Sequence, residues 1–566
     1  MRRTAAAGLV IVNGQVFTAD RSHPRAEAVA MRGAKIAAVG SNDEARKAAP
    51  DATVIDAAGR TVLPGLVDAH NHFLATGESL GMADVRYPKV ASIAGLVEAL
   101  AAAAAQSGFR SGDFLRAYGF DHAKYERAPT RWDLDRAAPG SPVLVGHISG
   151  HYVLANSLAM ERAGVTENTP DPPGGRIDRD ERGLPTGLFR DAAMVLVQPA
   201  AVDVGHHGPN FHVAADPADL TAAVERAGTA YLAAGLTTVC DAQVTSRELT
   251  AYRQARAQGR LLVRTVCMPL SHQLGSYQAT GLAGPFGNEW LSLGPMKFYC
   301  DGSLIGGTAA FSAQAADSRD PGHLAGSQAG TGAGTGAGTA AGAGAGLLFW
   351  DPAEFAEAIE QAHLAGWQVG VHAQGDAAIG LALDAFTRAQ HARPSADPRF
   401  RIEHCGYPTD AQLARMRDLG VIAVCQPSYL HDSGDDFLDA MPGIAHRLQP
   451  LRAELDLGIR VVLSSDSDVA SYRPLDTIAA AVRRQTRNGR AIGPDQALTV
   501  AEAVLAHTID AALAIGAEHR LGSLEPGKLA DLVILGGRLL ECPAEEISSL
   551  GVDITVIAGR VAHQAG

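Results

Sequence analysis

Short apolar runs alternate along this chain with longer stretches rich in alanine and leucine, and this alternation limits the possible folds more than any other feature. Repeated strand–helix units that build a parallel sheet are expected to give this pattern. Helical stretches such as Pro352–Ala365 and Asp410–Leu419 separate the runs. We therefore predict an α/β fold, either a (β/α)8 barrel or an open parallel sheet with the same periodicity. The eight runs are Val62–His72, Thr237–Asp241, Val263–Pro269, Met296–Gly302, Gln368–Ala373, Phe400–Cys405, Val421–Pro427 and Val461–Asp466.

Two parts of the chain do not fit the strand–helix repeat. Residues 76–216 separate the first run from the second by far more than one loop, and they contain the strand-like stretch Pro142–Gly146. We predict that they form an inserted subdomain. Both chain ends are rich in strand-like sequence, so residues 1–60 and 522–566 are predicted to build one small composite β-domain. The barrel would then comprise residues 61–75 and 217–521.

The segment 325–346 consists almost wholly of glycine, alanine and threonine. This composition offers no side chains that pack into a core, so we predict a flexible insert. Because the segment follows the fourth apolar run, it would leave the barrel at the rim where catalytic residues gather. A mobile lid is therefore the alternative to a tolerated insertion.

Composition and charge exclude several classes of protein. The 566 residues carry a formal charge of −13, which argues against nucleic acid or an anionic membrane surface as a partner. No apolar run reaches the roughly 18 residues that suggest a membrane span. The six cysteines include no C-x-x-C pair, and we interpret them as reduced thiols of a cytoplasmic protein.

The N-terminus imitates a short secretory signal, because an apolar stretch follows Met1, Arg2 and Arg3. However, Asn13-Gly14 interrupts the apolar sequence, and this pair is a strong signal for a hairpin turn. We therefore predict folded strand structure over Leu9–Asp20, with no cleavage site.

Histidines and one aspartate lie at the ends of four of the apolar runs. His70 and His72 end the first run, and because alternate strand residues share a face, both imidazoles can point into one space. His372, His404 and Asp466 end later runs, and in a barrel all these ends converge on one face. Imidazole nitrogens and carboxylate oxygens suit zinc, with a position left open for water. The pattern therefore predicts a metal centre.

Lys297 stands inside an otherwise apolar run. A buried lysine either forms a structural ion pair or, with its pKa lowered by burial, serves as a reactive amine. The residues around it leave both roles open.

Longer motifs around these residues resemble the amidohydrolase superfamily. Its first metal motif is similar to Leu63-Pro-Gly-Leu-Val-Asp-Ala-His-Asn-His72, and its C-terminal return to a small β-domain is similar to the sequence Leu521–Ile534. The resemblance runs from about residue 8 to 562 and implies a TIM-like barrel with a composite β-sandwich from both termini. The motifs that resemble the amidohydrolase-3 branch, which includes N-substituted formamide deformylases, are Met296–Ser303, Val371–Asp376, Arg401–His404 and Ser465-Asp466.

The resemblance implies a set of metal ligands. His70, His72 and Asp466 would bind one divalent metal ion, with zinc expected, and His372 and His404 would bind a second. A bound metal lowers the pKa of water and polarises the carbonyl that is attacked. Asp466 would be the catalytic residue, because it can take the proton of that water and deliver it to the leaving nitrogen.

Lys297, carboxylated by carbon dioxide, would bridge the two ions in the manner of related binuclear members. This chain departs from the branch at two places. The segment after Lys297 carries the Gly/Ala/Thr insert, and Ser467-Asp468-Val469 stand where a Pro-Val pair is more usual. Both departures concern the substrate loops and leave the metal ligands unchanged.

Several polar residues are candidates for binding the substrate. Gly146-His147-Ile-Ser-Gly-His151 lies in the predicted insert and resembles a segment near the substrate in this branch. A helix would place His147 and His151 on one face, since they are four residues apart, and hydrogen-bonded loop histidines are the alternative. His122, Tyr429 and Asp432 are further candidates.

We predict a metal-dependent hydrolase that cleaves an amide-type C–N bond of a small molecule, such as an N-acyl or N-formyl amine. A serine hydrolase is not favoured, because the chain has no G-x-S-x-G motif. The alternatives are a cyclic amide, carbamate or deaminase activity at the same centre, or a catalytically silent metal-binding homologue. The intact Asp466 argues against a silent homologue. The oligomeric state stays open, with a homodimer as one expectation.

Overall fold

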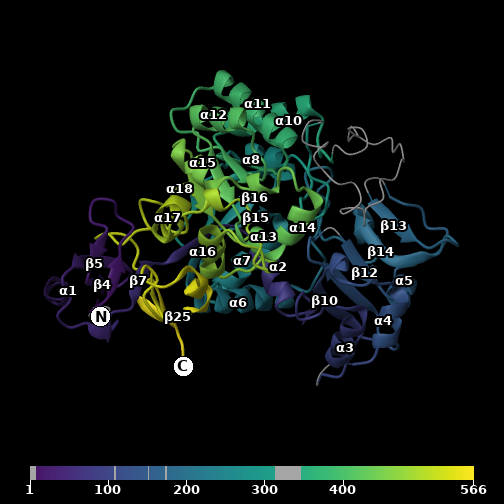
Figure 1. Cartoon of the computed structure of the whole chain (residues 1–566), viewed down its shortest axis with the longest axis horizontal. Coiled ribbons are helices and arrows are strands. Elements are labelled where there is room, and N and C mark those ends of the chain that lie inside the picture. Colours follow the sequence, from purple (N-terminus) through teal and green to yellow (C-terminus); the bar gives the residue numbers. More distant parts are fainter. Residues whose placement is uncertain (1–7, 107–109, 151, 173–174, 313–345) are drawn as a thin grey trace.

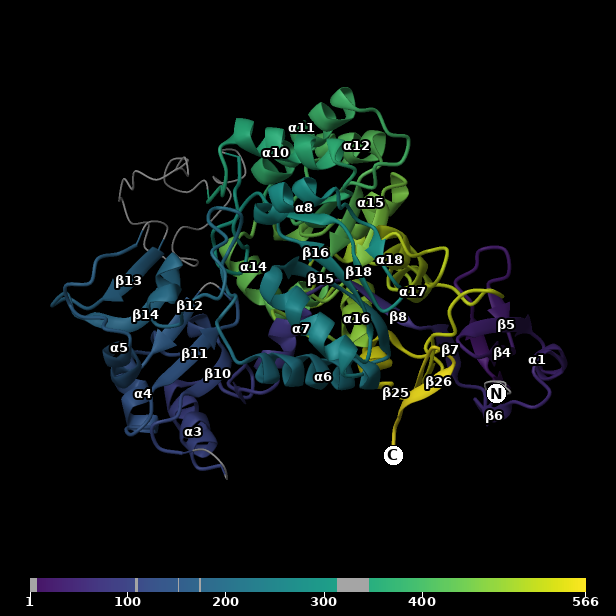
Figure 2. The same ribbon diagram turned by 180° about the vertical axis from the view of Figure 1, so that it is seen from behind.

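The computed structural model describes residues 8–106, 110–150, 152–172, 175–312 and 346–566. Figures 1 and 2 show a central helical region, with the strands of both chain ends on one side and an inserted segment on the opposite side. Predictions for His151 and for residues 325–345 of the Gly/Ala/Thr segment concern residues outside the described ranges.

Parallel strands that alternate with helices form the centre of the molecule. They make two sheets, with the orders β17-β18-β16-β15-β8 and β19-β20-β21-β22-β23, in which only β17 (Phe286–Gly287) is antiparallel to its neighbour. The parallel strands are β8 (Leu66–Asn71), β15 (Leu236–Val244), β16 (Arg264–Pro269), β18 (Leu291–Leu293), β19 (Met296–Tyr299), β20 (Val369–Ala373), β21 (Arg401–His404), β22 (Ile422–Cys425) and β23 (Arg460–Leu463). This arrangement confirms the predicted α/β class.

The two central sheets meet at both of their edges. On one side Leu270 forms a parallel bridge with Lys297. On the other side the backbone N–H of Asp466 donates to the carbonyl of His70 at 2.9 Å. These contacts agree with a ring of strands, while the closed (β/α)8 barrel stays a prediction.

Helices follow the central strands. The predicted helical stretches correspond to α10 (Pro352–Leu364) and α12 (Asp410–Leu419). The Asp351 side chain accepts hydrogen bonds from free backbone N–H groups in the first turn of α10. Gly420, with a φ of 63°, ends α12. The other longer helices are α6 (Pro217–Ala233), α7 (Ser246–Ala257), α8 (Leu274–Thr280), α11 (Asp376–Ala392), α14 (Gly434–Ala440), α15 (Leu451–Asp456), α16 (Pro474–Arg483), α17 (Val500–Ala506) and α18 (Ile509–Ala514).

The first apolar run, predicted as one strand over Val62–His72, is two strands in different sheets. β7 (Thr61–Pro64) joins the sheet of the chain ends, whereas β8 belongs to the centre. Gly65 lies between them, where a Cβ atom would collide with the Thr237 side chain. The single-strand prediction was wrong because apolar sequence continues across the corner at which the chain changes sheets.

Strands from both chain ends form two further sheets. Their orders are β5-β4-β1-β6 and β26-β25-β24-β7-β2-β3, and the second sheet pairs β7 with β24 antiparallel. Both ends thus contribute to one sheet as predicted, while the β-sandwich itself stays a prediction. The strands are β1 (Leu9–Val12), β2 (Gln15–Phe17), β3 (Arg25–Ala26), β4 (Ala28–Arg32), β5 (Lys35–Gly40), β6 (Thr53–Asp56), β24 (Leu532–Leu535), β25 (Val552–Ile557) and β26 (Arg560–Gln564), with helix α1 (Asn42–Ala48) after β5.

The hairpin predicted at Asn13-Gly14 is absent, although strands flank this pair. β1 pairs with β4 and β6, whereas β2 pairs with β3 and β7. Ile11 on β1 and Val16 on β2 both lie in the apolar cluster that also holds Val62 and Ile534. The chain therefore crosses from one sheet to the other at this turn, because that path buries both apolar strands in one core.

Residues 76–216 contain a sheet of their own, with the order β13-β14-β12-β11-β10-β9. Apolar residues on both faces of this sheet form two separate buried clusters. The boundaries of the predicted subdomain stay a prediction. The elements are β9 (Ala83–Asp84), α3 (Ile93–Ala104), β10 (Leu115–Phe120), α4 (Arg131–Ala137), β11 (Val143–His147), β12 (Tyr152–Ala155), α5 (Ser157–Arg162), β13 (Gly175–Arg179) and β14 (Pro185–Asp191).

All six cysteines lie in the described residues as free thiols, five of them buried and Cys542 partly exposed. Among the described residues, no helix combines the length and the apolar character needed to cross a membrane.

A buried ion pair joins the centre to the sheet of the chain ends. Arg264 on β16 donates to both carboxylate oxygens of Asp531, at 2.6 and 3.0 Å, and the guanidinium lies 4.8 Å from the Trp290 ring. Both charged side chains are almost fully buried. Removing Asp531 leaves the buried Arg264 charge with only the Glu289 carbonyl at 3.0 Å and the Glu289 carboxylate at 4.0 Å, so most of its compensation is lost.

Asp531→Ala is therefore expected to lower the free energy of unfolding by about 3 kcal/mol. The double variant Asp531→Ala with Arg264→Met should recover part of this loss, because no charge stays buried. Asp384, whose ion pair with Arg415 is largely exposed, provides the control, and Asp384→Ala should change stability little. Urea unfolding of the four proteins measures these values. Equal losses for Asp531→Ala and Asp384→Ala would contradict the assignment.

Candidate metal centre and its pocket

Three predicted ligands converge at the ends of β8 and β23. His70 lies in β8, His72 directly precedes helix α2 (Phe73–Ser79), and Asp466 follows β23. Asp466 Oδ1 lies 3.4 Å from His70 Nε2 and 3.0 Å from His72 Nε2. All three residues are buried, and each offers a ligand atom within 4.8 Å of the other two. The structure thus brings these residues together as the sequence predicted.

The donor atoms of this group fit a divalent cation. His70 Nε2 and Asp466 Oδ1 are fully buried, and neither has a hydrogen-bond partner among the described residues. A buried polar atom without a partner costs about 1–3 kcal/mol. A cation that accepts the lone pairs of two imidazoles and a carboxylate would remove this cost, and such a donor set is typical of zinc.

His372 and His404 form a neighbouring pair at the ends of β20 and β21. Their ring centres are 4.4 Å apart, and the His404 ring lies 4.8 Å from that of His70. Each ring has one nitrogen at an oxygen acceptor: His404 Nδ1 lies 2.8 Å from Gln426 Oε1, and His372 Nε2 lies 3.0 Å from the Gly302 carbonyl. Because an oxygen acceptor requires a donated N–H, the other nitrogen of each ring retains a lone pair.

Burial favours the neutral form of both rings. It lowers the pKa of His404 to about 3 and the pKa of His372 well below its usual value. Near neutral pH these imidazoles are therefore uncharged, as metal ligands must be.

Lys297 is fully buried in β19 beside this pair of histidines. Its ammonium nitrogen lies 4.6 Å from the Tyr299 ring centre and has no hydrogen bond or ion pair with any described residue. The geometry therefore does not support the structural ion pair that the sequence left open. Burial lowers the pKa of Lys297 to about 8, which increases the share of the neutral, nucleophilic amine.

Glu403 contacts the His70 ring on its Nδ1 side, and Arg401 in turn binds Glu403. The sequence predicted no role for either residue. Glu403 Oε2 lies 2.5 Å from His70 Nδ1. Arg401 donates to both carboxylate oxygens of Glu403, at 2.7 and 2.9 Å, and also to the Ala69 carbonyl at 2.8 Å. Burial would raise the pKa of Glu403, but the charges of Arg401 and His70 outweigh it and lower the pKa.

Two of the predicted ligand residues have a strained backbone. His404 and Asp466 adopt positive φ angles of 73° and 54°, a region that non-glycine residues rarely occupy. Such strain persists only where the surroundings over-determine the conformation, and it clusters at functional sites.

Tyr429 in α13 (Ser428–Asp432), predicted to bind substrate, donates its hydroxyl to Asp466 Oδ2. Burial would raise the pKa of Asp466, but the adjacent His70 and His72 side chains outweigh it and lower the pKa well below its usual value. Tyr429 therefore positions an ionised carboxylate. Asp432, in contrast, pairs with Arg487 and lines a different pocket.

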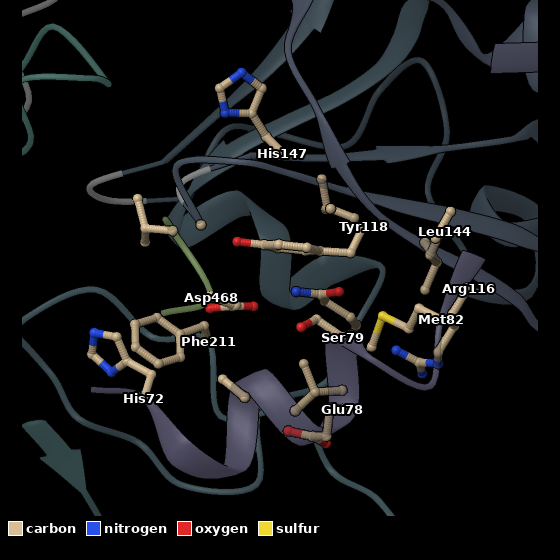
Figure 3. A pocket seen from close by; sticks show the side chains of 18 of the residues that line it. His72, Glu78, Ser79, Met82, Arg116, Tyr118, Leu144, His147, Phe211 and Asp468 are labelled. Atoms are coloured by element: carbon tan, nitrogen blue, oxygen red, sulfur yellow. The ribbon is translucent and has the colours of Figure 1, made fainter. Parts of the chain in front are cut away.

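We call His70, His72 and Asp466 the ligand group. A pocket of about 840 Å³ opens above this group, between the central strands and the inserted segment. Figure 3 shows His72, Phe211 and Asp468 on one side of this pocket and Arg116, Met82 and Leu144 on the other. The pocket residues that belong to or adjoin the candidate metal centre are His72, His372, His404, Tyr429 and Asp466. This volume is typical of small-molecule sites.

His147 lines the pocket, but it does not lie on a helix. His147 is the last residue of strand β11. The prediction that a helix places His147 on one face with His151 was therefore wrong for His147. His147 Nε2 lies 3.2 Å from His122 Nδ1, and His122 is not one of the pocket residues.

Tyr118 and Asp468 are pocket residues that the sequence did not identify. The Tyr118 hydroxyl donates to the Ile148 carbonyl at 3.1 Å. Burial raises the pKa of both Tyr118 and Asp468. Asp468 belongs to Ser467-Asp468-Val469, the stretch that departs from the amidohydrolase-3 pattern, so this departure was the available signal.

Residues 53–563 match the amidohydrolase family. The chain belongs to this family. It is 31% identical over 567 residues to an N-substituted formamide deformylase of Arthrobacter pascens, and the match covers 98% of each chain. It is therefore an amidohydrolase that acts on carbon–nitrogen bonds other than peptide bonds, as the sequence predicted.

Two solved structures of metal-dependent hydrolases have a similar fold. A metal-dependent hydrolase of Pyrococcus horikoshii superposes with a TM-score of 0.73 at 23% identity, covering 95% of this chain and 99% of the other. A metal-dependent hydrolase of Pyrococcus furiosus superposes with a TM-score of 0.70 at 25% identity, covering 93% and 98%. These neighbours imply an α/β, TIM-like fold.

Glu403→Gln should weaken metal binding while the protein stays folded. The amide keeps the size of the carboxylate but loses the charge that orients His70 and raises its basicity, so affinity should fall about 10- to 100-fold. Titration of metal against a competing chelator measures the change. Glu360→Gln is the matched control, because Glu360 also binds an arginine, Arg388, but on the surface. Unchanged affinity in Glu403→Gln would show that Glu403 does not support His70.

Proposed function

We propose that this amidohydrolase cleaves a linear amide, an N-acyl or N-formyl amine, at the centre formed by His70, His72 and Asp466. The observation that carries the proposal is the convergence of these buried, unpartnered ligand atoms at the wall of a pocket of small-molecule size. The formamide deformylase, similar along its whole length, supports the substrate class.

We further propose that His70, His72 and Asp466 hold one metal ion and His372 and His404 hold a second. Zinc is the preferred ion, since imidazole and carboxylate donors suit it. A divalent metal supplies Lewis acidity, which lowers the pKa of water and polarises a carbonyl.

Asp466 is proposed to move the proton of the reaction. Its low pKa keeps it ionised, so it can accept a proton from water while the water oxygen bonds to the amide carbon. When the C–N bond breaks, the same carboxyl group delivers that proton to the nitrogen. The products are a carboxylic acid, which is formic acid for a formamide, and an amine. Tyr429 holds Oδ2 of Asp466 and thereby fixes the orientation of the carboxylate.

Lys297 is proposed to be carboxylated. Its neutral nitrogen bonds to the carbon of carbon dioxide and loses a proton, which yields a carbamate with two oxygen donors and one negative charge. The modification exchanges a buried ammonium without a partner for an anion beside the neutral imidazoles of His372 and His404. An ammonium repels metal ions, whereas carbamate oxygens bind them.

Metal removal combined with a substrate panel tests the proposed function. Chelation should abolish hydrolysis, and added zinc or a similar ion should restore it, while His70→Ala should lose bound metal. The panel contains formamides, N-acyl amino acids, lactams and carbamates, and hydrolysis is expected for the linear amides. Full activity of a metal-free preparation, or turnover of lactams or carbamates alone, would contradict the proposal.

Lys297→Ala should lose most of the activity and the second equivalent of metal. Short-chain carboxylic acids should restore part of the activity, because they provide the missing oxygen donors. Lys297→Arg should stay inactive under the same conditions, since a guanidinium stays cationic and forms no carbamate. Lys47→Ala, at an exposed position on α1, is the control and should keep full activity. An unmodified Lys297 beside a single ion in electron density would refute the bridge.

A further inference from the structure

Arg116 lines the pocket from strand β10 of the inserted segment. Tyr118 lies two residues further along this strand and also lines the pocket, because alternate residues of a strand share a face. The Tyr118 hydroxyl faces Asp468, next to the ligand group, whereas Arg116 lies on the opposite side of Tyr118 in Figure 3. One step of two strand residues, roughly 6.8 Å, separates the two positions.

The guanidinium of Arg116 has no counterion. It forms no hydrogen bond or ion pair with any described residue, and its nearest printed contact is the Phe114 ring, 5.8 Å from the guanidinium carbon. Burial lowers the pKa of Arg116, and the charge of Glu78 offsets this only in part. A half-buried cation without a partner is costly, so proteins retain such a group where a ligand supplies the opposite charge.

The carboxylates of the pocket bind other groups, lie away from Arg116 or are exposed. Arg247 binds Glu78 at 2.5 Å, Tyr429 binds Asp466, and Asp468 lies on the opposite side of the pocket from Arg116 in Figure 3. Asp113 and Asp219 are exposed. Arg116 is therefore a half-buried cation available to a molecule that enters the pocket.

The surroundings of Arg116 are mainly apolar. Met82 and Leu144 lie beside it in Figure 3, and both line the pocket. A ligand at this end thus meets apolar side chains along its body and one cationic group. A planar guanidinium matches the two oxygens of a carboxylate.

We propose that the substrate is an acylated amine that carries a carboxylate, and that this carboxylate binds Arg116 while the amide lies at the ligand group. This inference rests on the proposed hydrolysis of a linear amide. Because Arg116 lies beyond Tyr118, the carboxylate belongs at the far end of an apolar chain and not directly beside the amide nitrogen. N-formyl and N-acyl derivatives of ω-amino acids have this chemistry.

Matched pairs of substrates test the inference. Each pair consists of an N-formyl ω-amino acid and its primary amide, which has the same length and no charge, in a series of increasing chain length. The wild-type enzyme should prefer the acid over the amide at the best chain length by about 10- to 100-fold in kcat/KM. Arg116→Met should abolish this preference by lowering kcat/KM for the acid to the level of the amide, and Arg116→Lys should keep part of it.

Arg162→Met is the matched control. Its guanidinium lies over the same Phe114 ring at 5.6 Å, but it does not line the pocket, so the preference for the acid should persist. Melting temperature and metal content of all variants verify that they are folded and loaded.

The outcomes separate this inference from the proposed function. Hydrolysis of both members at equal kcat/KM would overturn the carboxylate site and leave the function intact. If no member is hydrolysed, calorimetric binding of each pair decides: tighter binding of the acid to the wild type than to Arg116→Met supports the carboxylate site. Equal binding to both proteins overturns it.

Discussion

The buried ionic chain from Arg401 through Glu403 to His70 determines how the centre of this molecule is arranged. All three side chains are buried, so the free energy cost of removing their charges from water must be offset by direct contacts. Arg401 provides these contacts through two bonds to Glu403 and one to the backbone of β8. These hydrogen bonds connect β21 to β8 and fix the orientation of the His70 ring. The other ligands are arranged around this ring.

The pocket lies between two parts of the chain that each have sheets of their own. The central strands present the ligand group at their ends, and the inserted sheet presents β10 and β11 above it. Chemistry and substrate recognition are therefore divided between them. Residues such as Asp466 and Tyr429 belong to the first part, whereas Tyr118, His147 and Arg116 belong to the second. This division allows the recognition side to vary while the ligand geometry is retained.

The sequence predicted those features that are local to a strand. The ends of apolar runs singled out five of the six proposed ligand residues, because strand direction alone places such ends on one side of a parallel sheet. Lys297, inside its run, was singled out by its charge. The α/β class and the family also followed from the sequence. Features that depend on tertiary pairing were missed. Asn13-Gly14 has hairpin sequence, but the choice between sheets was decided by burial against Val62 and Ile534. The roles of Glu403, Tyr118 and Arg116 depend on which distant residues face them.

The change of sheet at Gly65 links the sheet of the chain ends directly to the strand that carries His70. β7 pairs with β24 near the C-terminus, and five residues after Gly65 the same backbone carries His70. Only Gly65 separates β7 from β8, so the pairing of β7 with β24 fixes the start of the segment that carries His70, the first of the proposed metal ligands. The small sheet is therefore not a detachable module. A chain cut after the last central strand would free β7, and the position of His70 would lose its anchor on one side.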